Sequence, residues 1–210
     1  RSQTVVTRPF LCPGIRLYLV TSACPLWYAD EDDVQSMQLA DPYWAFAWPG
    51  GQALARYLLD RPELARGRRV LDVGTGGGIV AIAAALGGAR RVCASDIDPL
   101  AAAAARLNAE LNGVELEIDT HDWIGARTGD FDLIVAGDMC YEAGFTRGLL
   151  VWLRASAQRG CRVLLADPGR GHLRGDDLRE LASYRTPIDI DDAERFFCNA
   201  RVYELVPGGS

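Results

Sequence analysis

Several aspartates stand directly after short apolar runs of the sequence, where a carboxylate can meet a ligand. These residues are Asp96, Asp98, Asp122, Asp138 and Asp167. In an open α/β sheet, ligands bind beyond the carboxyl ends of the strands, so carboxylates that follow the strands are brought to one edge. A carboxylate there can accept hydrogen bonds from ribose hydroxyl groups or attract a cation. The pattern therefore indicates a site for a nucleotide-like ligand and for a cationic group.

A glycine-rich turn provides the second chemical feature. The apolar run at residues 70–73 is followed by four glycines within residues 74–78, and small apolar residues recur at helical spacing from Ile79. Glycines let bare N–H groups and the positive end of a helix approach a ligand. A dinucleotide fingerprint would need glycine where Ile79 stands. The run Asp72-Val73-Gly74-Thr75-Gly76-Gly77-Gly78 instead resembles the acidic-x-G-x-G-x-G motif of class I methyltransferases that use S-adenosylmethionine.

Asp96 lies about 20 residues beyond this turn, where a doubly wound fold offers a carboxylate to ribose hydroxyls. The plainer interpretation of Asp96 is a helix cap. Asp98 is followed by Pro99 and suits that role better. We therefore expect Asp96 to bind the ribose of the ligand.

Asp122 and Trp123 follow a third predicted strand. Methyltransferases often place a carboxylate there for the adenine amino group, with an apolar neighbour against the ring. Asp122 could equally cap the next turn; we favour the contact of Asp122 and Trp123 with adenine, and expect His121 to be a surface residue rather than a base.

Trp48 belongs to an aromatic-rich segment, residues 43–48, just before the helix-breaking run Pro49-Gly50-Gly51. Core packing is the usual role of such aromatics. The break would also place Trp48 at a helix N-terminus near the glycine turn. Trp48 is therefore a candidate wall of the ligand site, with a purely structural role as the equal alternative.

Asp138 and Tyr141 form a D-x-x-Y pattern after a fourth predicted strand. The simpler interpretation is that Asp138 only forms part of the turn at the end of this strand. The pattern also resembles the post-strand motif of the seven-strand protein lysine methyltransferases. A carboxylate draws in a lysine ammonium and a tyrosine ring helps to orient it, while water can take the proton. We expect Asp138 and Tyr141 to act on the lysine, and Asp138 also to border the cofactor.

Alternating strands and helices are predicted to position these residues. Strands are expected at residues 70–73, 91–95, 116–120, 132–136 and 162–166, with helices from 79, 99 and 145, a further helix at 176–184, and a terminal antiparallel hairpin at 187–190 and 196–205. This order predicts an α/β fold with a doubly wound, mostly parallel seven-stranded sheet and helices on both faces, which is Rossmann-like. Residues 1–45 are expected to be an N-terminal extension with a candidate edge strand at 15–20 and a loop around 30–41. Residues 46–210 are expected to form a class I methyltransferase domain, as the glycine motif implies.

Composition excludes several other chemistries. All 22 basic residues are arginine, which rules out a Walker-type phosphate loop and a Schiff-base lysine. The net charge of −6 and the dispersed arginines disfavour a nucleic-acid partner. Six scattered cysteines and two distant histidines predict reduced thiols and no metal site. No apolar run is long enough to cross a bilayer.

Several of these segments together resemble the family of lysine methyltransferases that modify the electron transfer flavoprotein β subunit. They are DPYWAFAWPGGQALARYLLD, the glycine motif with SDIDP, GDMCYE and ADPGR, and they span residues 41–170. The resemblance implies methyl transfer from S-adenosylmethionine, with S-adenosylhomocysteine as product. It also implies that Asp72, Gly74, Gly76 and Asp96 hold the cofactor and that Asp138 and Tyr141 serve the lysine. Gly77 and Gly78 depart from the glycine motif of the animal enzymes. The resemblance therefore implies the cofactor more strongly than it implies the protein substrate.

Alternatives remain open at this point. The enzyme could methylate another protein, such as a ribosomal protein, or a small amine, or the chain could be a non-catalytic cofactor-binding module. The expected setting is the cytoplasm of a bacterium, or the mitochondrial matrix in a eukaryote. A monomer acting on a protein, with neither nucleic acid nor membrane as a partner, is expected.

Overall fold

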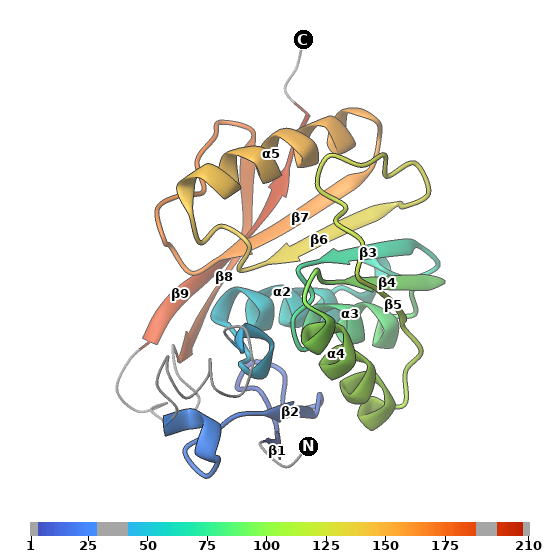
Figure 1. Cartoon of the computed structure of the whole chain (residues 1–210). Coiled ribbons are helices and arrows are strands. Elements are labelled where there is room, and N and C mark those ends of the chain that lie inside the picture. The colour runs from blue at the N-terminus through green and yellow to red at the C-terminus, as the bar shows by residue number, and fades with distance from the viewer. Residues whose placement is uncertain (1–3, 29–41, 188–196, 208–210) are drawn as a thin grey trace.

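A computed structural model describes residues 4–28, 42–187 and 197–207 (Figure 1). The predicted loop at 30–41 and the predicted strand residues 188–190 lie outside the described residues. Within the described part, no helix is long and apolar enough to cross a membrane.

The main element is a seven-stranded sheet with the order β5-β4-β3-β6-β7-β9-β8. The first five of these strands are parallel, whereas β9 runs antiparallel to both β7 and β8. This arrangement confirms the predicted α/β class and the mostly parallel sheet. The strands are β3 (Arg69–Val73), β4 (Arg91–Ser95), β5 (Glu117–Asp119), β6 (Leu133–Gly137), β7 (Arg162–Asp167), β8 (Leu178–Pro187) and β9 (Phe197–Leu205).

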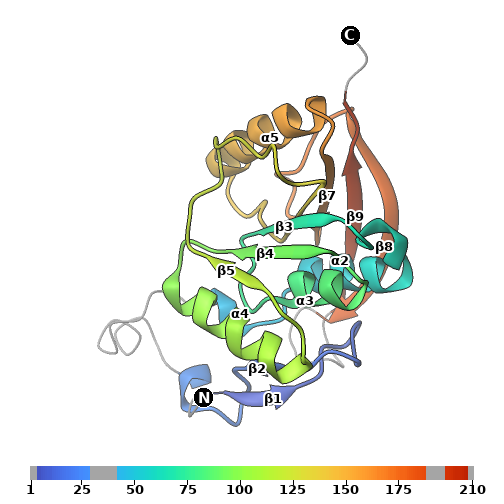
Figure 2. The same cartoon turned by 90° about the vertical axis from the view of Figure 1, so that its right-hand side faces the viewer.

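Helices cover both faces of this sheet. Helices α2 (Pro49–Asp60), α3 (Ile79–Leu86) and α4 (Pro99–Asn112) lie on one face, and α5 (Ala143–Gln158) lies on the other (Figures 1 and 2). Single-turn 3-10 helices occur at η1 (Pro25–Tyr28), η2 (Tyr43–Ala45) and η3 (Pro62–Leu64). The sheet is therefore buried on both sides, as the continuous apolar strands of a parallel sheet require.

Alternation along the strands divides the core into two layers. Val70 packs with α2 and α3, whereas the next residue, Leu71, packs with α5. The same alternation recurs at Leu133 and Ile134 of β6. Side chains point to opposite faces at successive strand positions, so one short apolar run supplies both layers.

The ends of α4 show the local chemistry that sets helix boundaries. Asp98 is its N-cap, and the Asp98 side chain accepts a hydrogen bond of 2.8 Å from the backbone N–H of Leu100. Gly113 ends the helix in the left-handed conformation, with φ of 66°. The predicted cap at Asp98 and the predicted helix end at Gly113 are both confirmed.

The N-terminal residues form a small sheet of their own. Strands β1 (Val5–Thr7) and β2 (Leu17–Leu19) pair antiparallel with each other and join no strand of the main sheet. The prediction of an edge strand at 15–20 is therefore wrong. The side chains of Ile15, Leu17 and Leu19 are instead buried in the core layer that contains α2 and α3. The division of the chain at residue 45 stays a prediction.

The predicted helix at 176–184 is also wrong, because this segment belongs to β8. A bulge between Glu180 and Ala182 shifts the pairing of β8 with β9. Leu178 consequently packs in the α5 layer, while Leu181 and Ala182 pack in the opposite layer. An extra residue in a strand breaks the period-2 alternation, and the resulting spacing of three and four residues imitates a helix. The predicted terminal hairpin is present, but its first strand is β8.

Glycines bring helix α2 close to the carboxyl ends of β6 and β7. A Cβ atom on Gly137 would lie 2.9 Å from the Cα atom of Gly51, and one on Gly50 would lie 2.9 Å from the backbone oxygen of Ala166. Real Cβ atoms do not approach backbone so closely. The start of α2 therefore rests directly on the ends of β6 and β7.

We expect Gly137→Ala to destabilise the protein by about 1–3 kcal/mol, because the added methyl group must push α2 away from β6. Gly148→Ala is the matched control, since a Cβ at this position in α5 meets nothing within 4 Å. That control should gain about 0.5–1 kcal/mol from its higher helix propensity. Urea unfolding with a common slope would measure both. Equal stabilities for Gly137→Ala and the wild type would refute the close contact.

Candidate active site

The glycine turn between β3 and α3 is held from beneath by Asp72. Gly74, Gly76 and Gly78 all have positive φ angles, of 63°, 53° and 85°. One carboxylate oxygen of Asp72 accepts hydrogen bonds from the Thr75 hydroxyl at 2.6 Å and from the Ala81 backbone N–H at 3.0 Å. Asp72 thus ties the strand, the turn and the first part of α3 together. Its predicted part in holding the cofactor stays a prediction.

Asp72 is only 1% exposed, and this burial strongly shifts the pKa of its carboxyl group. Burial raises the pKa of Asp72 from 3.8 to about 7, while the hydrogen bonds from Thr75 and Ala81 act in the opposite direction. A buried carboxylate without a cationic partner favours its protonated form. Asp72, the acidic residue of the glycine motif, is therefore protonated over part of the pH range in which most aspartates are ionised.

Asp96 stands beside the turn at the end of β4. One of its oxygens accepts the Gly76 backbone N–H at 2.9 Å, and the other accepts the Asp98 backbone N–H at 3.1 Å. Burial raises the pKa of Asp96 above its ordinary value, and the two backbone hydrogen bonds oppose this shift. Each carboxylate oxygen has two acceptor positions, so each can also accept from a hydroxyl group. This geometry suits the two vicinal hydroxyls of a ribose.

Asp122 and Trp123 are held by contacts within their own loop. Asp122 accepts the Ile124 backbone N–H at 2.9 Å, as a turn cap would. The Trp123 indole N–H donates to Asp119 at 2.9 Å, and its ring meets the Phe131 ring edge-on at a centroid distance of 5.3 Å. Asp119, the last residue of β5, is a polar strand-end residue that the sequence analysis missed. The adenine contact predicted for Asp122 and Trp123 is not tested by these contacts.

The aromatic segment reaches the glycine turn through the backbone of Trp44. A Cβ on Gly77 would lie 2.9 Å from the Trp44 carbonyl oxygen, so this segment packs on the turn. Trp48 is the N-cap residue of α2, and its indole N–H donates to the Tyr43 carbonyl at 2.7 Å. The Trp48 ring also faces the Arg170 guanidinium at 5.9 Å. Its position beside the glycine turn, as a wall of the cofactor site, stays a prediction.

Asp138 lies at the junction of β6, α2 and the segment after β7. It has a positive φ of 58°, a left-handed conformation that aspartate tolerates better than most residues. One carboxylate oxygen accepts the Gly51 backbone N–H at 2.6 Å, and the other accepts Arg170 Nη1 at 2.9 Å. Burial raises the pKa of Asp138 above its ordinary value, whereas Arg170 lowers it.

Tyr141 and Met139 complete the segment after β6. Tyr141 is 57% exposed and stacks on the Phe145 ring at 5.1 Å. Burial raises the pKa of Tyr141, and the charge of Asp96 raises it further. The ends of β4 and β6 lie at one edge because both strands pair parallel with β3. The Met139 side chain lies on Gly74, where a Cβ would collide with its sulfur. No sequence signal marked Met139, because its contact joins two turns far apart in the chain.

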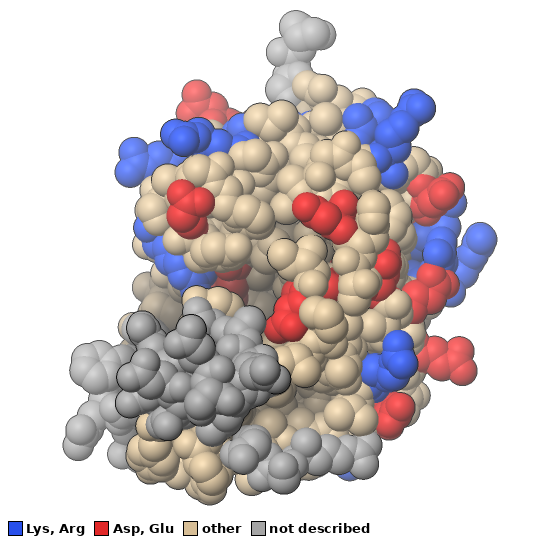
Figure 3. All heavy atoms as spheres, viewed as in Figure 1, with Lys and Arg blue, Asp and Glu red and all other residues tan. Residues whose placement is uncertain are grey.

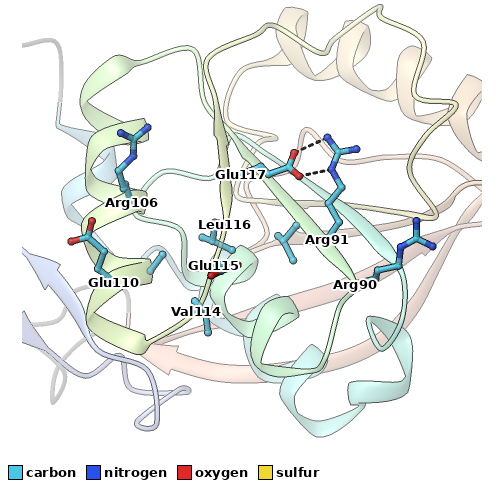
Figure 4. Close-up of a pocket in the computed structure, with 10 residues that line it drawn as sticks. Arg90, Arg91, Arg106, Glu110, Val114, Glu115, Leu116 and Glu117 are labelled. Carbon is cyan, nitrogen blue, oxygen red and sulfur yellow. Dashed lines mark hydrogen bonds and ion pairs between the residues drawn. The ribbon is translucent and has the colours of Figure 1, made fainter.

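Figure 3 shows acidic side chains near the middle of one face of the molecule, with acidic and basic side chains interspersed around its rim. A pocket of about 430 Å³ lies elsewhere, between α4 and the amino ends of β4 and β5 (Figure 4). Its wall includes Arg106 and the ion pair of Arg91 with Glu117 at 2.6 Å. Because Arg91 begins β4 and Asp96 follows its end, this pocket is not the site at the strand ends.

The described residues contain no group of three or more side chains suited to hold a metal ion. The six cysteines, all of them within the described ranges, are free thiols, and five are buried.

Comparisons with known proteins indicate the family. A family model described as ribosomal protein L11 methyltransferase (PrmA) matches residues 52–139. A solved L11 methylase from Lactobacillus delbrueckii subsp. bulgaricus is 26% identical, with a TM-score of 0.54 over 76% of this chain and 79% of its own. An electron transfer flavoprotein β subunit lysine methyltransferase from Xenopus laevis is 46% identical, over 97% of this chain and 84% of its own length. The protein of the same name from Rattus norvegicus is 42% identical, over 94% of this chain and 78% of its own length.

The chain belongs to the electron transfer flavoprotein β subunit lysine methyltransferase family. This confirms the resemblance that the sequence motifs indicate, and it makes the protein a methyltransferase. Its cofactor is S-adenosylmethionine.

The residues of this methyltransferase fit the cofactor. Asp96 offers two oxygens that each retain an acceptor position, and the turn beside it has the bare backbone that three left-handed glycines provide. Bound there, S-adenosylmethionine supplies an electrophilic methyl group on a sulfonium. Asp96 would hold the cofactor at this turn, and Asp138 follows the end of β6 at the same edge of the sheet.

The raised pKa of Asp72 makes stability depend on pH. The folded pKa exceeds the unfolded one, so the folded protein holds the proton more tightly, and stability falls as pH rises from about 4 to about 7. At 1.36 kcal/mol per unit, the loss is at most about 4 kcal/mol. Asp72→Asn keeps an oxygen for Thr75 and Ala81 but carries no charge. In the cofactor-free protein, this variant should lose less stability than the wild type between pH 5 and pH 8 in urea titrations. Parallel pH profiles would contradict the assignment.

Asp96→Ala should weaken S-adenosylmethionine binding at least about tenfold, because hydrogen bonds to a charged group contribute roughly 1.5–3 kcal/mol each. Titration calorimetry measures the affinity. Glu115→Ala is the control, since it removes the same charge from an exposed residue that lines the pocket of Figure 4. Unchanged affinity in a folded Asp96→Ala protein would remove Asp96 from the ribose site.

Proposed function

We propose that this chain methylates lysine side chains of the electron transfer flavoprotein β subunit, with S-adenosylmethionine as methyl donor. The observation that carries the proposal is the position of Asp138 and Tyr141. They follow β6, at the same strand edge as Asp96 and the glycine turn, and Tyr141 is the exposed member of the pair. A cation-attracting carboxylate with an aromatic ring beside a methyl donor suits an amine acceptor. The names of the relatives supply the identity of the protein substrate.

In this mechanism the protein aligns an amine with the methyl group. The Asp138 carboxylate draws in the lysine ammonium, and the exposed Tyr141 ring orients its chain. Loss of one proton from the ammonium to water would free the nitrogen lone pair; with S-adenosylmethionine bound, the methyl group would then pass from sulfur to this nitrogen and S-adenosylhomocysteine would be released. Holding two reactants in line accounts for roughly 7–11 kcal/mol of barrier reduction at best, so no dedicated base is required.

A second protein substrate is favoured by one specific observation. Residues 52–139 match the L11 methyltransferase family model, and they include the glycine turn, Asp96 and Asp138. Ribosomal protein L11 is therefore the alternative acceptor to test. A small amine and a non-catalytic cofactor-binding module are the remaining alternatives, and neither has an observation of its own.

We also propose the setting of the reaction. The six free thiols suit a reducing compartment, either the bacterial cytoplasm or the mitochondrial matrix of a eukaryote. A net charge of −6 with dispersed arginines supports a protein rather than a nucleic acid as partner. We propose that the enzyme acts as a monomer.

The test is methyl transfer from labelled S-adenosylmethionine to purified electron transfer flavoprotein, to purified L11, and to a lysate. Label in the flavoprotein β subunit alone supports the proposal. Label in L11 supports the alternative substrate, label in a small product supports an amine acceptor, and cofactor binding without any transfer supports a binding module. Mass spectrometry of the labelled protein identifies the lysines and the number of methyl groups.

Asp138→Asn should reduce turnover by one to several orders of magnitude, because losing a buried charged partner costs about 2–5 kcal/mol. S-adenosylmethionine affinity should stay near the wild-type value. Tyr141→Phe should be milder, because the ring face remains. Steady-state kinetics with the flavoprotein and calorimetry with the cofactor separate these effects. Near-normal turnover of Asp138→Asn would leave Asp138 a turn residue, and a joint loss of affinity and turnover would place it with the cofactor.

A further inference from the structure

Asp138 is not alone beneath the strand edge, because a second carboxylate lies within reach of the same arginine. Arg170 Nη1 is 2.9 Å from one oxygen of Asp138 and 3.9 Å from Oδ2 of Asp167. The two carboxylate side chains are 9% and 4% exposed, whereas that of Arg170 is 27% exposed. Arg170 is thus the most exposed of the three side chains, and its guanidinium occupies one oxygen of Asp138 that a lysine ammonium would need.

The hydrogen bonds of Asp167 are incomplete. Its Oδ1 atom accepts the backbone N–H groups of Gly169 and Arg170, at 2.7 and 3.0 Å. Its Oδ2 atom is buried and has no hydrogen-bond partner among the described residues. A buried carboxylate oxygen without a partner is costly, so it marks a position that another donor can fill. The nearest cationic donor is Arg170 Nη1.

Charge counting leads to the same conclusion. With both aspartates ionised, two buried carboxylates share one guanidinium, and the cluster has one excess negative charge. One further cation would complete it. Buried charges need a partner, so the cluster as it stands is suited to receive an alkylammonium group.

We propose that Asp138 binds the alkylammonium group of the substrate lysine, and that Arg170 moves from Asp138 to Asp167 when this lysine binds, so that each carboxylate then has one cationic partner. This inference rests on the proposed function and deepens it. Arg170 fills the lysine position in the free enzyme, and Asp167 is the positioning residue that receives Arg170. The Trp48 ring, 5.9 Å from the guanidinium, lies beside the path of this exchange.

A double-mutant cycle tests the exchange. Asp167→Asn keeps an oxygen for the backbone donors of Gly169 and Arg170 but removes the charge that receives Arg170. It should raise the KM for the flavoprotein β subunit at least about tenfold, with little change in kcat or in cofactor affinity. In the Arg170→Met background, the same substitution should change this KM less than about threefold, because there is no arginine left to receive.

The control is Asp176→Asn, which removes the same charge from an exposed residue a few positions along the chain and should leave the KM unchanged. Equal effects of Asp167→Asn in both backgrounds, or none in either, would overturn the exchange. Failure of the wild type to methylate the subunit would overturn the proposed function, and this inference with it. The two failures are thus distinguished by the wild-type assay alone.

A second measurement uses the wild-type enzyme, so it does not depend on whether any variant folds. Crystals of the wild-type enzyme with S-adenosylhomocysteine are soaked with n-butylammonium chloride, whose four-carbon chain matches a lysine side chain. The expected result is an ammonium group on Asp138 and Arg170 hydrogen-bonded to Oδ2 of Asp167. Bound n-butylammonium with Arg170 still on Asp138 would refute the exchange, as would the absence of the probe from this cluster.

Discussion

The hydrogen bond from the N–H of Gly51 to the carboxylate of Asp138 joins the three parts on which the site depends. It connects the first turn of α2, the end of β6 and, through Arg170, the segment that follows β7. A helix N-terminus has unpaired N–H groups and a partial positive charge, so an anion at this position is stabilised twice. Gly50, Gly51 and Gly137 allow the approach by leaving the contact free of side chains. The edge that carries Asp138 is therefore fixed by backbone contact.

Local chemistry made much of this fold predictable from sequence. Asp98 with Pro99 and the terminal Gly113 mark the ends of α4, and the glycines after β3 mark a turn that only they can adopt. The strand-end aspartates could be found because parallel strands bring their carboxyl ends to one edge. Each of these signals lies within a few neighbouring residues, so no knowledge of tertiary contacts was needed.

The features that sequence reasoning missed depend on contacts between distant segments. The bulge in β8 follows from its pairing with β9, and the segment read alone has helical spacing. The contact of Met139 with Gly74 joins two turns whose proximity only the folded sheet reveals. The pairing of Arg170 with Asp138 spans two strand ends, and nothing in either local sequence specifies it.

The close contact between α2 and β6 also determines where the enzyme can be redesigned. A Cβ at position 50 or 137 would lie within 3 Å of backbone, and one at position 51 would crowd Ile79, so a change in acceptor size at these positions would displace α2. Three larger side chains lie around this contact without forming it: Arg170 pairs with Asp138, the Trp48 ring faces Arg170, and the exposed Tyr141 follows Asp138 by three residues. A library aimed at bulkier or shorter amines would therefore vary these three positions and keep the glycines, because the backbone then continues to present Asp138 in one place while the surrounding walls change.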